Sequence, residues 1–249
     1  MRVDEYNLKR KSKIGSTDRV SSIGAKERRV KTVKLLLEDE PRVILDAGCG
    51  NGLLSRKFKK RGNIVVGAEI NVGEAKNASK FLDLVVLCNL ERKWPFKDET
   101  FDAVHMGAFL EHIFDYHHAL NEANRVLKLG GVLVVSVPNG VCLRDRILML
   151  LGKQPKWYEL MEHIHFWTIP WLRKILAMHG FEEIVIEGTS FPLKEFLYKY
   201  KIFNRIFGYL EKRLPGFCIT LIYKGIKTKN VVVFDEHLPE DITYVEATE

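Results

Sequence analysis

Three glycines follow a short apolar run in the first quarter of the chain. The run 43–45 leads into Asp46, and Gly48, Gly50 and Gly52 then alternate with other residues. A glycine has no Cβ atom, so it permits a tight turn and lets a ligand approach the backbone closely. Such a loop at the carboxyl end of a parallel strand can bind a nucleotide-like cofactor. A tight turn without a ligand is the simpler alternative.

The spacing of the glycines narrows the choice of cofactor. A dinucleotide fingerprint, Gly-x-Gly-x-x-Gly, requires its third glycine where this chain has Leu53, and Gly52 comes one residue early. The spacing therefore disfavours a nicotinamide dinucleotide. Glu69 ends the next predicted strand, about 20 residues after the glycines, where a carboxylate can accept hydrogen bonds from both hydroxyls of a ribose. A solvated surface glutamate is the alternative.

Three histidines are candidates for catalytic residues. His112 follows the fourth predicted strand, and His163 and His165 come shortly before a predicted helix. Imidazole exchanges a proton near neutral pH and therefore suits the deprotonation of an acceptor. Hydrogen-bonded structural histidines are the alternative explanation. The His-x-His pair lacks a clear third ligand in the sequence, so no metal site is expected.

Predicted strands and helices alternate along the chain. We expect strands at 43–45, 64–66, 83–87, 101–105, 132–137, 181–186 and 217–223. We expect helices at 23–37, 53–61, 75–80, 117–128 and 168–180. The helix over 53–61 would direct its free N–H groups towards a ligand on the glycine loop. This alternation indicates an α/β fold with a mainly parallel sheet and helices on both faces.

Four stretches in the same region resemble the class I S-adenosylmethionine-dependent methyltransferases. The first is the glycine loop preceded by Asp46, and the second joins Cys88-Asn89-Leu90 to a Trp-Pro-Phe turn. The third is 106–113, which contains a Leu-Glu-His sequence, and the fourth is 125–133, which contains Gly-Gly. Their order along residues 43–138 is more specific than any one of them.

The resemblance implies a particular fold and a particular cofactor. The fold would be Rossmann-like and doubly wound, with a seven-stranded mostly parallel sheet, an antiparallel last strand and a helical insertion before that strand. S-adenosyl-L-methionine would be the methyl donor and S-adenosyl-L-homocysteine the product. The implied cofactor-binding residues are Asp46, Gly48, Cys49, Gly50, Gly52, Glu69, Ile70, Asn89, Leu90, Met106 and Gly107. The family usually has Asp where this chain has Asn89, whose amide oxygen can still accept a bond from the adenine amino group.

The charge divides the chain into three parts. The net charge is +7, and residues 1–34 hold 11 Lys and Arg against 4 Asp and Glu. Residues 231–249 hold 6 acidic residues and no Lys or Arg. We therefore expect a basic N-terminal arm with the start of the first helix (1–34), a methyltransferase domain (35–230) and an acidic C-terminal tail (231–249).

A helical insertion at 191–215 has an apolar stripe opposite a basic face. Such a helix can pack on the domain, cover an apolar acceptor as a lid, or touch an anionic membrane surface. The expected function is methyl transfer by in-line displacement to a small-molecule or lipid-like, amphipathic acceptor. Two alternatives are an RNA or protein methyltransferase that grips its substrate with the basic arm, and a non-catalytic S-adenosylmethionine-binding protein. Nucleic acid is the less favoured partner, because the chain lacks the Asp/Asn-Pro-Pro-aromatic loop of base-amino methyltransferases.

The cellular location is predicted from what the sequence does not contain. The first residues carry no apolar segment typical of a secretion signal, and no apolar run is long enough for a membrane span. Four cysteines lie far apart without a Cys-x-x-Cys pair. We therefore expect a cytoplasmic protein.

Overall fold

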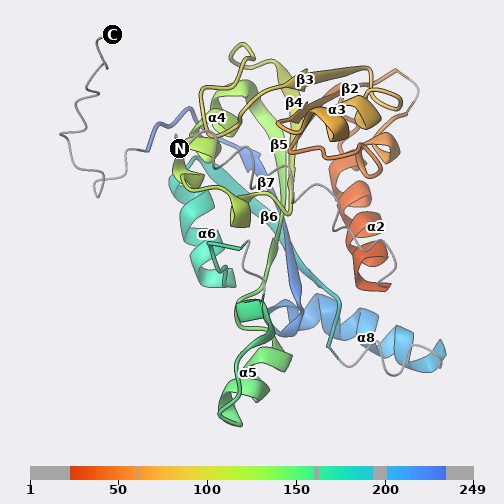
Figure 1. Cartoon of the computed structure of the whole chain (residues 1–249), viewed down its shortest axis with the longest axis vertical. Helices are drawn as coiled ribbons and strands as arrows, with labels where there is room; N and C mark the ends of the chain where they lie inside the picture. Colours follow the sequence, from red (N-terminus) through yellow and green to blue (C-terminus); the bar gives the residue numbers. More distant parts are fainter. Residues whose placement is uncertain (1–22, 61, 160–162, 193–200, 234–249) are drawn as a thin grey trace.

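The computed structural model describes residues 23–60, 62–159, 163–192 and 201–233 (Figure 1). Most of the predicted basic arm (1–22), most of the acidic tail (234–249) and the start of the insertion (193–200) lie outside the described residues. The predicted boundaries of the methyltransferase domain at 35 and 230 therefore stay a prediction.

Seven strands form one sheet in the order β3-β2-β1-β4-β5-β7-β6. They are β1 (Val43–Ala47), β2 (Ile64–Glu69), β3 (Leu84–Leu87), β4 (Phe101–Gly107), β5 (Leu127–Pro138), β6 (Phe181–Thr189) and β7 (Thr220–Lys227). Neighbouring strands pair in parallel from β3 to β5, whereas β7 runs antiparallel to both β5 and β6. The prediction of a Rossmann-like, mostly parallel sheet with an antiparallel last strand is confirmed.

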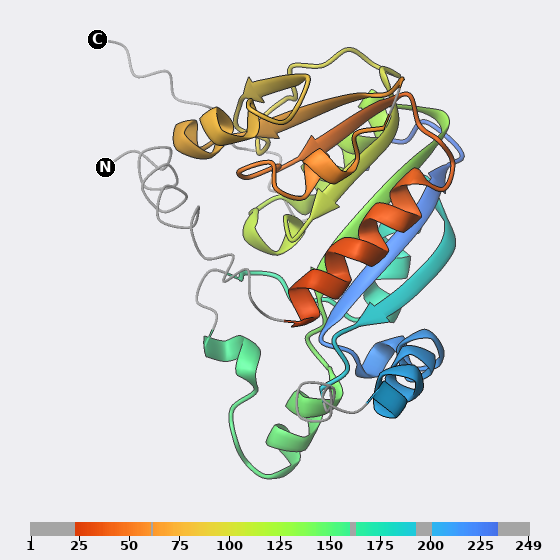
Figure 2. The same ribbon diagram turned by 90° about the vertical axis from the view of Figure 1, so that its right-hand side faces the viewer.

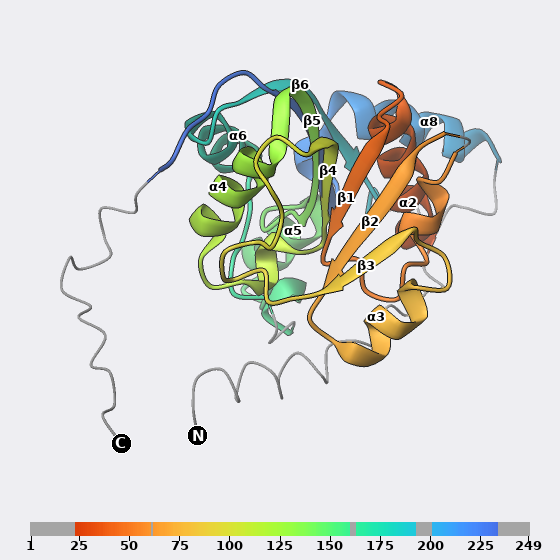
Figure 3. The same cartoon turned by 90° about the horizontal axis from the view of Figure 1, so that it is seen from above.

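Helices cover both faces of the sheet, as Figure 3 shows from above. The α-helices are α2 (Ile23–Leu37), α3 (Val72–Ala78), α4 (Tyr116–Val126), α5 (Leu143–Leu150), α6 (Ile169–Met178) and α8 (Lys201–Arg213). α2 and α3 lie on one side and α4 and α6 on the other. The predicted helix 23–37 has the observed bounds. α6 begins at its predicted cap, where the Thr168 hydroxyl accepts a bond from the Trp171 N–H.

Two hydrophobic cores hold these layers together, because successive side chains of a strand point to opposite faces. In β1, Ile44 joins the core that contains Leu36 of α2. The next residue, Leu45, joins the core that contains Leu120 of α4. All four side chains are fully buried, so β1 is fixed from both faces. The carboxyl end of this strand is therefore a rigid base for the loop that follows.

The segment after the glycine loop differs from the prediction. Instead of a helix over 53–61, the chain forms a 3₁₀ turn at Ser55–Lys57, so the helix prediction is wrong. Ser55 and Phe58 are both fully buried, and the Ser55 hydroxyl bonds to the carboxylate of Asp46. These contacts tie the segment to the end of β1. The loop therefore lacks the predicted helix dipole.

α5 and α8 lie at the same end of the molecule (Figures 1 and 2). The sequence did not predict α5, whose last residue, Leu150, is 86% exposed, so its apolar residues do not all face a core. Phe207 of α8 is buried in a small core with Phe191 and with Cys218 next to β7, and Leu143 of α5 packs against this core. This part of the insertion packs on the domain. Within the described ranges, no helix has both the length and the apolar character needed to span a bilayer.

Candidate functional site

A cavity of about 600 Å³ opens at the carboxyl ends of β1, β2 and β4. The glycine loop and the end of β2 form one part of its wall, and the segment after β4 forms another. Arg28 and Arg29 of α2 also line it. The carboxyl edge of a parallel sheet is where open α/β folds bind their ligands. The cavity therefore lies where the sequence predicted a site.

The glycine loop presents bare backbone to this cavity. Gly50 has φ +53°, and a Cβ atom built there would have no neighbour within 4 Å, so the residue borders open space. Gly52 has φ +75°, and a Cβ atom there would lie 2.9 Å from the Cα of Ala78. Both positions favour glycine for its left-handed backbone, and Gly52 also because α3 packs closely. Gly50 thus leaves room for a ligand, and Gly52 holds the loop against α3.

Glu69 connects the loop to the end of β2. Its carboxylate accepts bonds from the N–H groups of Gly50 (2.9 Å), Ile70 (2.9 Å) and Asn71 (2.8 Å). A carboxylate has about four acceptor positions, and these three N–H groups leave about one of them for a hydroxyl group of a ligand. Glu69 therefore fixes the loop and faces the cavity at the same time.

Asp46 lies at the centre of a cluster of buried polar side chains. Asp46 was predicted from the sequence, but its partners were not. One of its oxygens lies 2.7 Å from Nδ1 of His105, and the other accepts the Ser55 hydroxyl. Asp46 and His105 are 2% and 1% exposed. His105 could have been suspected as the one histidine within the apolar strand β4, although only the fold shows its partner.

Most of the predicted cofactor-binding residues come together at this cavity. Its lining includes Asp46, Gly48, Cys49, Gly50, Glu69, Ile70, Asn89, Leu90 and Gly107. Gly52 lies behind the loop, and Met106 is fully buried in the core, so these two do not line the cavity. Burial raises the pKa of the Cys49 thiol, so this residue is a neutral part of the wall.

The histidines divide into two groups. His112 of the 3₁₀ turn Leu110–His112 and His163 line the cavity, with ring centroids 4.8 Å apart. His165 is not part of the lining; its Nε2 lies 2.8 Å from the carbonyl oxygen of Ile113, and its ring packs against Tyr116. The structure therefore brings two of the three predicted catalytic histidines to the cavity.

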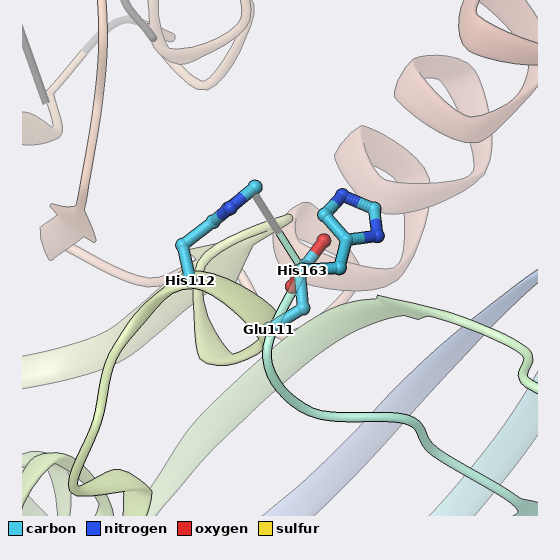
Figure 4. Close-up of side chains that lie close together, drawn as sticks. All are labelled: Glu111, His112 and His163. Atoms are coloured by element: carbon cyan, nitrogen blue, oxygen red, sulfur yellow. The ribbon is translucent and has the colours of Figure 1, made fainter. Parts of the chain in front are cut away.

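Glu111 joins these two histidines (Figure 4). One ligand atom from each of Glu111, His112 and His163 lies within 4.8 Å of the other two. Glu111 and His112 come from the turn after β4, and His163 comes from the segment before α6. Glu111 is 2% exposed, yet its Oε2 finds no hydrogen-bond partner among the described residues, and neither does Nδ1 of His163.

Burial changes the acid–base properties of this cluster. It raises the pKa of Glu111 to about 7. Burial, with a smaller effect from neighbouring His112, lowers the pKa of His163 to about 4. The His163 imidazole is therefore neutral near pH 7. Glu111 could not be predicted from the sequence beyond its place in the Leu-Glu-His stretch, because its burial depends on chain segments that are distant in sequence.

Comparison with known proteins assigns this chain to a family. A family model described as a methyltransferase domain matches residues 45–135. A demethylmenaquinone methyltransferase from Thermus thermophilus is 37% identical over 126 residues, which are 47% of this chain and 57% of the relative. A demethylmenaquinone methyltransferase from Tropheryma whipplei is 31% identical over 166 residues, 59% of this chain and 70% of the relative.

A solved structure has the same fold at lower identity. An S-adenosylmethionine-dependent methyltransferase from Thermotoga maritima superposes with a TM-score of 0.60 at 23% identity, covering 82% of this chain and 89% of its own. The chain belongs to the class I S-adenosylmethionine-dependent methyltransferases. It spans little more than half the length of the Thermus relative.

The residues of the cavity fit the cofactor of this family. Gly50 borders open space, Glu69 keeps free acceptor capacity, and Asn89 lines the same wall. The Asn89 amide oxygen accepts the Glu91 N–H at 3.0 Å and has a second lone pair for an amino group. The cavity therefore offers acceptor groups that fit the ribose and the adenine of this cofactor.

Proposed function

We propose that this protein transfers a methyl group from S-adenosylmethionine to a small, apolar acceptor that carries a hydroxyl group. The observation that carries the proposal is the continuity of one cavity from the glycine loop to Glu111, His112 and His163. Such a cavity can hold a cofactor at one end and an acceptor at the other. Its volume lies in the range typical of small-ligand sites.

The binding residues have separate roles in this proposal. Glu69 binds the ribose hydroxyls, Asn89 the adenine amino group, and the backbone of Gly48 and Gly50 the amino acid part of the cofactor. When bound, S-adenosylmethionine supplies a methyl group on a positively charged sulfur, and the acceptor takes this methyl, releasing a proton and leaving S-adenosylhomocysteine. The chain contributes mainly proximity and alignment, because the donor is already activated.

At the acceptor end of the cavity, His112 and His163 are polar side chains with apolar neighbours. Ile113, Pro138 and Ile219 line the cavity together with the two histidines. A few polar groups in an apolar wall orient a ligand of the same character. Two relatives are named for demethylmenaquinone, which supports a quinol-like acceptor for this chain.

Peripheral contact with an anionic membrane surface would bring such an acceptor to the enzyme. Leu150 and Leu151 at the end of α5 are 86% and 66% exposed. Lys153, Lys212 and Arg213 are exposed in the same end of the molecule, on the α5 segment and on α8. Exposed apolar side chains flanked by basic ones suit the surface of an anionic bilayer. We place the protein in the cytoplasm, which its four free cysteines support.

Calorimetry tests the cofactor first. We expect S-adenosylhomocysteine to bind with micromolar affinity and NADH not to bind, since the glycine spacing is wrong for a dinucleotide. S-adenosylhomocysteine needs no acceptor and does not turn over. Absence of binding would overturn the proposal.

Acceptor class and membrane contact are tested next. With bound cofactor, we expect methylation of quinol-like phenols and not of polar amines of similar size. In vesicle sedimentation, the double variant Leu150→Glu with Leu151→Glu should bind anionic vesicles about 100-fold less or weaker still, because burying each leucine is worth about 1.5–3 kcal/mol. Leu129→Glu is the control. Leu129 is also exposed (61%), but it lies near the amino-terminal end of β5 and not on α5. Equal binding of all three proteins would contradict the membrane contact.

A further inference from the structure

We propose that Glu111, His112 and His163 bind one divalent transition-metal ion at the wall of the cavity. From the sequence no metal site is expected, because the His-x-His pair lacks a clear third ligand. The fold separates that pair, since His165 bonds to the backbone of Ile113. Beside His163 lie instead Glu111 and His112, which come from a different part of the chain and supply the other two ligands.

The three ligand atoms are close enough to share an ion after small side-chain rotations. They lie within 4.8 Å of one another. Ligands about 2.0–2.2 Å from a tetrahedral ion lie about 3.4 Å apart. The side chains must therefore approach by about 1.4 Å, which rotation about side-chain bonds can supply. The backbone that carries them need not move far, because the Ile164 N–H bonds to the Glu111 carbonyl oxygen at 2.8 Å.

Two buried atoms of the cluster indicate that a ligand belongs there. Oε2 of Glu111 and Nδ1 of His163 find no hydrogen-bond partner in the described parts of the chain. A buried polar atom without a partner costs about 1–3 kcal/mol. A cation bound between the three side chains would give the buried Glu111 carboxylate a partner. Without a metal ion, these atoms stay without a hydrogen-bond partner among the described residues.

The ligand set predicts which ion binds and how it is exposed. Two imidazoles and one carboxylate suit zinc, cobalt or ferrous iron better than magnesium, which prefers oxygen ligands. Three protein ligands leave at least one coordination position open, as in sites that bind substrate. All three residues line the cavity, so the open position faces the acceptor.

The ion would act on the acceptor in the proposed function, and this part of the inference rests on that function. A hydroxyl oxygen bound to the ion has a lowered pKa, so it can release its proton to water before the methyl group is transferred. The binding of the ion itself does not depend on methyl transfer. The proposed metal site and the proposed methyl transfer can therefore each be wrong while the other is right.

The test is metal titration of the full chain after removal of metal with a chelator. We expect calorimetry to show one Zn²⁺ or Co²⁺ per chain and no binding of Mg²⁺ at the same concentration. Glu111→Gln and His163→Asn should each weaken Zn²⁺ binding at least roughly tenfold, since each removes a ligand. The control His165→Asn should bind Zn²⁺ within about twofold of the unmodified chain. Circular dichroism checks that each variant is folded. If one of the two ligand variants fails to fold, the other still tests the site.

A spectrum distinguishes this site from other metal sites. The Co²⁺ absorption spectrum should lack a thiolate charge-transfer band, because no cysteine is in the cluster. Absence of saturable binding, equal loss in His165→Asn, or a thiolate band would each overturn the inference. S-adenosylhomocysteine binding in the same samples shows whether the proposed function holds independently.

Discussion

The two ends of the cavity treat their buried polar groups differently. At the glycine-loop end, both oxygens of Asp46 and both oxygens of Glu69 lie within hydrogen-bond distance of groups of the protein itself. At the histidine end, Glu111 and His163 each keep a buried atom without a partner among the described residues. Nε2 of His105 at the glycine-loop end is also buried without a partner in the described residues, so the contrast lies in the carboxylates. Those of Asp46 and Glu69 are held on both oxygens by the protein, whereas that of Glu111 is not. A preformed cofactor end beside an unsatisfied acceptor end suits an enzyme that binds its two substrates separately.

The comparison predicts its largest effect at Asp46. Asp46→Ala removes the acceptor from two buried partners, His105 and the Ser55 hydroxyl. Hydrogen bonds to a charged group are worth about 1.5–3 kcal/mol each, so the free energy of unfolding should fall by about 3 kcal/mol or more. Urea denaturation without ligand measures it, with Asp46→Asn as the variant that keeps the shape. A loss below about 1 kcal/mol would mean that the glycine-loop end is not held in this way.

Glu69 should give the next effect, on the cofactor. Glu69→Ala removes hydrogen bonds to a carboxylate, so S-adenosylhomocysteine should bind about 10- to 150-fold more weakly, or about 1.5–3 kcal/mol. Calorimetry measures the affinity. Glu183→Ala is the control. Glu183 lies on β6, at the far edge of the sheet, and pairs with Arg173 of α6. Unchanged affinity in Glu69→Ala would show that the strand-end carboxylate does not bind the cofactor.

His163 should give the smallest effect, and this sharpens the comparison. His163→Asn changes the acceptor end alone, so the affinity for S-adenosylhomocysteine should change by less than about 0.5 kcal/mol, roughly twofold. The same calorimetric titration measures it. If His163→Asn weakens this affinity as much as Glu69→Ala does, the two ends are not separate sites.

The sequence determined the part of the site that is local. The positions of Gly48, Gly50 and Glu69 at the cavity could be predicted because the turn and the strand end that carry them are set by short-range backbone requirements. The alternation of apolar residues in β1 and the cap of α6 at Thr168 are local for the same reason. The order of the motifs along the chain then indicated the family.

Tertiary structure decided the rest. Whether 53–61 forms a helix depended on Ser55 and Phe58 being drawn to the core under β1. The choice between His163 and His165 could not be made from the sequence, because neighbouring residues outside regular elements point in directions set by their packing. The burial of Glu111 beside His112 arises where a turn after β4 meets the segment before α6. Local chemistry thus determined the cofactor loop, and contacts between distant segments determined the acceptor end.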